Sequence, residues 1–108
     1  MINELIEEAY QTAKEKGWWE RDPALPELIA LMHSELSEVI EEYRNGRGLT
    51  ETYYDNKHKP CGIPSELADI IIRALAVCGR YDIDLETALI EKMDYNKKRE
   101  YRHGDKVV

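Results

Sequence analysis

The segment from Pro64 to Gly79 constrains the fold of this chain more than any other part of the sequence. Its apolar residues cover nearly the whole circumference of a helix, and a helix that is apolar all round is normally buried. The polar exceptions, Glu66, Asp69 and Arg73, fall within one narrow wedge. Because an unpaired carboxylate is very costly to bury, this wedge must face a cation, basic side chains or a water-filled pocket.

Three further helices are predicted around this segment. Apolar residues recur at helical spacing over 2–16 and 26–44. A fourth helix is expected to begin after Asp82 or Asp84, either of which can serve as its N-cap. In the second helix the predicted inward stripe is Leu28, Leu31, Met32, Leu36, Val39, Ile40 and Tyr43. The fold class is therefore all-α, with a core like a four-helix bundle.

Residues 45–64 lack a helical pattern and contain several glycines and prolines. They predict an irregular loop or a short hairpin that turns at Asp55-Asn56. A connection this long inside a compact domain is uncommon and is often functional.

Length and charge limit the class of protein. A chain of 108 residues fits one domain, 1–108. A net charge of −7 argues against holding a nucleic-acid backbone by counterion release. The chain lacks the apolar stretch of about 18 residues that a membrane-spanning helix needs, and its acidic N-terminal segment is unlike a signal peptide. A cytoplasmic location is expected, with Cys61 and Cys78 as free thiols.

Two pairs of carboxylates carry the chemistry. Glu35 and Glu38 are three residues apart, as are Glu66 and Asp69, and residues at this spacing share one face of a helix. Taken alone, the first pair is a solvated helix flank and the second forms a salt bridge with Arg73. Taken together on two packed helices, they form a cluster that repels itself unless a cation neutralises it. Oxygen ligands without a thiol or imidazole set predict Mg²⁺, with Mn²⁺ as an alternative.

One stripe of the fourth predicted helix changes from apolar to polar and cationic along its length. Its apolar residues, expected to point inward, are Leu85, Ala88, Leu89 and Met93. The same stripe continues as Lys92, Asn96 and Arg99. A basic last turn also complements the helix dipole, so these residues could simply be solvated. A metal cluster that faces Lys and Arg is, however, the recurring arrangement for binding polyphosphate.

The order of these motifs resembles a known family. The pattern E-x-x-E, then E-x-x-D, then K-x-x-x-N is similar to that of the MazG-like members of the all-α nucleoside triphosphate pyrophosphohydrolase superfamily. The resemblance covers most of the chain, including AKEKGWW, LIALMHSELSEVIEEYR, GIPSELADIIIRALAVCGRYDIDLETAL and EKMDYNKKREYRHG.

The resemblance implies Mg²⁺-dependent hydrolysis of a nucleoside triphosphate to the monophosphate and pyrophosphate. The metal ligands that it implies are Glu35, Glu38, Glu66 and Asp69. Glu35 and Glu38 are both candidates for the general base, and Trp18 could stack on the nucleobase or be a core aromatic. The residues implied to contact phosphate or sugar are Lys92, Asn96 and Arg99.

The related proteins form dimers or dimers of dimers, so a homodimer or homotetramer is expected here. A domain of this size has a limited core, which points the same way. The alternative function is a non-catalytic helical module that binds metal or nucleotide and acts in regulation.

Overall fold

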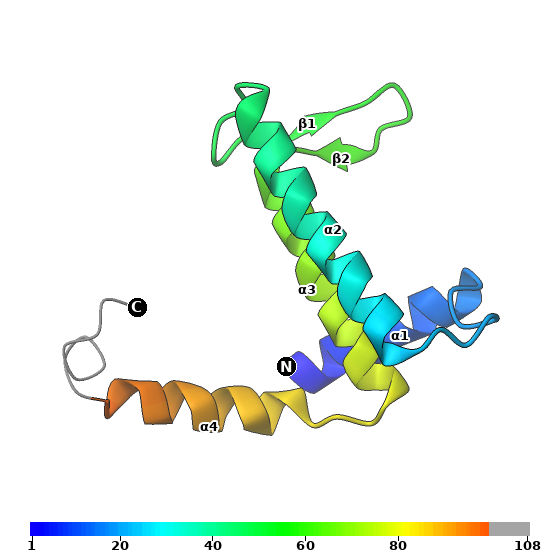
Figure 1. Cartoon of the computed structure of the whole chain (residues 1–108), viewed down its shortest axis with the longest axis vertical. Helices are drawn as coiled ribbons and strands as arrows, with labels where there is room; N and C mark the ends of the chain where they lie inside the picture. The colour runs from blue at the N-terminus through cyan, green and yellow to red at the C-terminus, as the bar shows by residue number, and fades with distance from the viewer. Residues whose placement is uncertain (100–108) are drawn as a thin grey trace.

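A computed structural model describes residues 1–99 of the chain, and its helices and hairpin are shown in Figure 1. The elements in chain order are α1 (Ile2–Glu15), α2 (Leu25–Arg44), β1 (Tyr53–Tyr54), β2 (Pro60–Cys61), α3 (Ile63–Arg80) and α4 (Leu85–Lys97). The all-α class, the four helices and the short hairpin between the second and third helices are confirmed. The end of the family-like segment EKMDYNKKREYRHG, residues 100–104, lies outside the described residues.

Helix α3 is the centre of the fold, with α1 packed on one side and α2 on another. The buried core has two parts, both at the C-terminal end of α3. One is formed by Ile6, Leu75 and Cys78. The other is formed by Ala13, Trp19 and Ala76. The predicted burial of the third helix is therefore confirmed for its last turns but not for its middle, where Leu67, Ile71 and Ile72 are exposed because no described helix covers that face.

Gly79 allows α1 to approach α3 closely. A Cβ atom built on Gly79 would lie 2.5 Å from Tyr10 Cβ and 2.9 Å from Tyr10 Cγ. Non-bonded carbon atoms are normally about 3.5–4.0 Å apart, so any larger residue would push the two helices apart. The position of α1 against the core thus depends on the absence of a side chain at residue 79.

Helix α2 presents a different face to α3 from the one predicted. Its half-buried residues are Leu28, Met32, Glu35, Val39 and Glu42. The exposed members of the predicted inward stripe are Leu31, Leu36, Ile40 and Tyr43. Glu35 and Glu42 turn inward because they find polar partners there, whereas Glu38 stays exposed. Arg73 of α3 pairs with Glu35, and the hydroxyl of Tyr53 donates to Glu42.

Helix α4 is joined to α1 at its beginning and then projects away from α2 and α3 (Figure 1). Asp84 is its N-cap and accepts a 3.2 Å hydrogen bond from the Thr87 N–H. Glu86 Oε1 accepts hydrogen bonds from the Met1 amino group at 3.0 Å and from the Ile2 N–H at 2.9 Å. This carboxylate therefore satisfies free donors at the start of α1, where the helix dipole favours negative charge.

The apolar stripe of α4 is largely solvent-exposed, which corrects the prediction that it points inward. Leu85 packs against the first core cluster. The exposed members are Ala88, Leu89 and Met93. The physical reason is that α4 leaves the domain after its first turn, so no other helix of the described chain covers its later residues.

The hairpin positions the start of α3. Its strands pair antiparallel, and Asp55 Oδ1 closes the turn by accepting from the N–H groups of Lys57 at 2.8 Å and Lys59 at 3.0 Å. Gly62 then caps α3 with φ +114°, and a Cβ on it would lie 2.4 Å from the Glu51 carbonyl oxygen. Only glycine fits this position, which lies one helical turn before Glu66.

Both cysteines are free: Cys78 is buried in the core and Cys61 is half-buried in β2. Across residues 1–99, none of the helices combines the length and the apolar character that crossing a lipid bilayer requires.

Candidate metal centre

Three carboxylates meet between α2 and α3. Glu35, Glu66 and Asp69 each offer one oxygen, and these oxygens all lie within 4.8 Å of one another. All three side chains are half-buried. In the octahedral shell of a Mg²⁺ ion, adjacent ligand oxygens are about 3.0 Å apart and opposite ones about 4.2 Å apart, so side-chain rotations that draw the three oxygens closer together would let them share one ion. A donor set made only of carboxylate oxygens suits a hard divalent cation.

The charge of Glu66 is unfavourable in this environment. Burial is the main cause that raises the pKa of Glu66, and the negative charges of Asp69, Glu35, Glu38 and Glu42 raise it further. A carboxyl whose pKa is higher in the folded than in the unfolded chain lowers stability as the pH rises through that interval. At neutral pH the ionised Glu66 therefore destabilises the fold unless a cation is nearby.

The pKa of Asp69 is raised for the same reasons. Burial raises its pKa first and the charge of Glu35 second, while Lys59 and Arg73 act in the opposite direction. Within residues 1–99, neither Asp69 nor Glu66 forms an ion pair. Half-buried carboxylates with raised pKa values and no paired cation are typical of functional sites.

Arg73 contacts this group through its member on α2, Glu35. Its Nε donates to Glu35 Oε1 at 3.0 Å, and only 24% of the Arg73 side chain and 16% of the Glu35 side chain are exposed. The simpler interpretation of the sequence, a salt bridge between Arg73 and the carboxylate pair on its own helix, is not what the structure contains. The crossing of α2 over α3 decides the pairing.

The fourth predicted ligand, Glu38, lies outside the group of three. Its side chain is exposed, although its charge is close enough to raise the pKa of Glu66. One turn further along, Glu42 accepts hydrogen bonds from the Tyr53 hydroxyl at 2.8 and 3.0 Å. The Arg47 guanidinium covers the ring of Tyr53, 3.5 Å from its centroid. Sequence reasoning missed Tyr53, because no periodic pattern links a hairpin residue to a helix.

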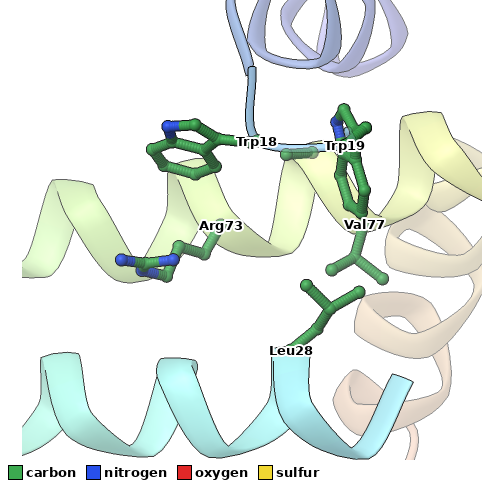
Figure 2. Close-up of a pocket in the computed structure, with 6 residues that line it drawn as sticks. Trp18, Trp19, Leu28, Arg73 and Val77 are labelled. Atoms are coloured by element: carbon green, nitrogen blue, oxygen red, sulfur yellow. The ribbon is translucent and has the colours of Figure 1, made fainter. Parts of the chain in front are cut away.

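Trp18 borders three hollows, one of which Asp69 of the carboxylate group also lines. It lines a groove of about 450 Å³ between α1 and α3 together with Asp69 and Ile72. It also lines a hollow of about 240 Å³ that includes Arg73. Figure 2 shows the Arg73 guanidinium facing the Trp18 ring, whose centroid is 5.0 Å away. Trp18 is 46% exposed and therefore accessible to a planar ligand.

Trp19 has a different environment from its neighbour in sequence. It is buried. Both tryptophans line the pocket drawn in Figure 2, where Trp19 lies on the same side as Val77 and Leu28. Its ring also contacts Tyr10 of α1, with centroids 6.0 Å apart. Trp19 is thus a core aromatic, and of the two tryptophans only Trp18 is available to a ligand.

The predicted phosphate contacts lie on α4 or, for Arg99, just after its end, away from the carboxylates of the same chain. Lys92, Asn96 and Arg99 are all exposed. Lys92 Nζ and the Arg99 guanidinium lie 5.9 and 5.8 Å from the centroid of the Tyr95 ring. The cations therefore gather on one side of the helix, as their spacing predicts, but a single chain does not bring them to Glu66 or Asp69.

Comparisons with models of protein families, with curated proteins and with solved structures find no match to this chain. What the protein does must therefore be argued from the geometry and electrostatics of its carboxylate group.

Proposed function

We propose that this protein is a Mg²⁺-dependent nucleoside triphosphate pyrophosphohydrolase of the MazG-like kind. It would hydrolyse canonical or noncanonical nucleoside triphosphates to the monophosphate and pyrophosphate, as in clearing unwanted nucleotides from the cytoplasm. The observation that supports this best is the half-buried group of Glu35, Glu66 and Asp69, whose charges raise one another's energy. A fold keeps such a group at a cost in stability, and binding a divalent cation is the chemistry that offsets it.

The carboxylates would act as metal ligands and as the general base. Glu35, Glu66 and Asp69 would hold Mg²⁺, or Mn²⁺, which accepts the same oxygen donors. A bound divalent cation supplies Lewis acidity toward phosphate oxygens and makes water more acidic. Of the two candidate bases, Glu38 is better placed than Glu35 to orient and deprotonate the attacking water. Glu35 is held by Arg73, whereas Glu38 is exposed and forms no ion pair with residues 1–99.

The nucleobase would lie in the groove beside Trp18. This groove is lined by Asp69 and by apolar side chains such as Ile72 and Leu75. Its volume of about 450 Å³ lies within the range of roughly 300–1,000 Å³ for small-molecule sites. Stacking on Trp18 would hold a base next to the carboxylates, so that the attached phosphates reach the metal ligands.

The proposal includes a homodimer or homotetramer in which a second copy supplies the cations of α4. The large apolar side chains exposed on α2 and α4 include Leu36, Ile40 and Tyr43 of α2 and Ile90 and Met93 of α4. Full burial of one such side chain contributes roughly 1.5–3 kcal/mol, so pairing these surfaces would strongly favour association. In that arrangement Lys92, Asn96 and Arg99 of one copy would face the carboxylate group of the other.

Mixing two inactive variants tests this arrangement. Lys92→Ala removes a cation of α4, and Glu66→Gln removes a carboxylate of α3. If each site uses α4 from the partner, mixed dimers contain one intact site. Unfolding and refolding an equal mixture should then recover about a quarter of the wild-type activity in a two-fold dimer. A mixture of Glu66→Gln and Asp69→Asn, both on the same half of the site, should stay inactive. If the protein sediments as a dimer and the first mixture stays inactive, the site does not use α4 of the partner copy.

The activity itself is tested by pyrophosphate release from a panel of canonical and modified ribo- and deoxyribonucleoside triphosphates, each with Mg²⁺ or Mn²⁺. We expect metal-dependent release from at least one of them, and none in EDTA. Binding of metal and nucleotide without turnover of any member of the panel would instead support a regulatory module. That outcome would sink the enzymatic proposal.

A further inference from the structure

Arg73 connects the two parts of the candidate site. It projects from α3 one turn after Asp69, and its Nε donates to Glu35 Oε1 at 3.0 Å. Its guanidinium also faces the exposed ring of Trp18, with 5.0 Å from the guanidinium carbon to the ring centroid (Figure 2). One side chain therefore contacts a carboxylate of the metal group and the aromatic residue that borders the groove.

Arg73 has the features of an internal counter-ion for Glu35. Both side chains are mostly buried, with 24% of Arg73 and 16% of Glu35 exposed, so solvent screens the pair weakly. Glu35 is also one of the three residues whose oxygens converge. The single contact through Nε uses one oxygen of Glu35, and the remaining guanidinium N–H groups are not used by any other carboxylate among residues 1–99.

Resting on the metal centre proposed above, we infer that Arg73 is a positioning residue that takes the place of the divalent cation while the centre is empty. It holds the Glu35 side chain in the group and offsets part of its charge. A divalent cation brought to the same carboxylates repels the guanidinium and competes with it for Glu35. The guanidinium then remains beside Trp18, where its N–H donors are available to a phosphate oxygen of the ligand.

The first consequence is a gain in metal affinity when the charge is removed. Mg²⁺ alone is titrated into the full chain by calorimetry, without nucleotide. Arg73→Gln and Arg73→Met, the second of which keeps the apolar stem, should each bind Mg²⁺ about 5- to 150-fold more tightly than the wild type, the usual range for coupling between two sites. Arg73→Lys keeps the charge and should stay close to the wild type. If Arg73→Gln does not fold in EDTA, Arg73→Met provides the measurement.

Arg80 offers a matched control on the same helix. It is also partly buried, pairs with Asp22 and lies 5.4 Å from the ring of Trp19, but it does not contact the carboxylate group. Arg80→Gln should leave the Mg²⁺ affinity unchanged. Equal or weaker Mg²⁺ binding by both Arg73 variants, with clear binding by the wild type, would overturn the role of Arg73 and leave the metal centre standing. Absence of Mg²⁺ and Mn²⁺ binding in every protein, the wild type included, would overturn the metal centre and this inference with it.

Discussion

Replacing Glu66 with glutamine is expected to lower pyrophosphate release by at least about 100-fold, because loss of a direct metal ligand should cost no less than loss of the groups that support one. Glutamine keeps the shape of the side chain but removes the charge that would bind Mg²⁺. Glu66 is one of the three residues that converge between α2 and α3. The rate of pyrophosphate release at saturating Mg²⁺, together with Mg²⁺ affinity by calorimetry, measures the effect.

Stability separates loss of the site from loss of the fold. Burial and neighbouring carboxylates raise the pKa of Glu66, so its ionised form destabilises the folded chain at neutral pH. In EDTA at pH 7, Glu66→Gln should therefore be at least as stable as the wild type, whereas Mg²⁺ should stabilise only the wild type. Glu41→Gln is the control, because Glu41 is exposed on α2 and pairs with Arg44. Full activity of Glu66→Gln would show that the metal ligands are assigned wrongly.

Replacing Gly79 with alanine is expected to lower the free energy of unfolding by about 1–3 kcal/mol, the usual cost of inserting a group into a packed interface. The new Cβ would lie 2.5 Å from Tyr10 Cβ, which is attached directly to the backbone of α1 and cannot rotate away. Helix α1 must then shift from the core formed with Leu75 and Cys78. Urea unfolding followed by circular dichroism measures the loss.

Gly48 provides the matched substitution. A Cβ at Gly48 meets Glu51 Cβ at an ordinary 3.5 Å, and Gly48 has no left-handed φ. Gly48→Ala should therefore change the free energy of unfolding by less than about 0.5 kcal/mol, as is usual for surface substitutions. If Gly79→Ala were as stable as Gly48→Ala, the close crossing of α1 and α3 would not be a property of the protein.

Local chemistry is the part of this protein that can be predicted from its sequence. The first three helices begin and end within about two residues of their predicted bounds, the usual uncertainty of helix ends, and α4 begins directly after Asp84, one of its two predicted N-caps. Asp84 caps α4 through its own side chain, and Asp55 closes the hairpin turn within five residues. Such signals act between residues that are near in sequence, so the order of the amino acids is sufficient to place them.

The packing of whole helices was decided only in the tertiary structure. An apolar stripe as broad as that of α2 can face a neighbour at several rotations, and the partners of Glu35 and Glu42 select the one that half-buries these two glutamates. The same contacts separate Glu35 from Glu38, which are equivalent in sequence pattern.

The sequence by itself determined which residues share a helix face: Glu66 with Asp69, and Lys92 with Asn96. A periodic pattern specifies positions around one helix axis. It does not specify which residues of another helix lie opposite, because that depends on crossings such as Gly79 against Tyr10 and on the direction in which α4 leaves the domain. Only the tertiary structure therefore decided that three carboxylates and Arg73 form one group, and that the cations of α4 lie apart from it within a single chain.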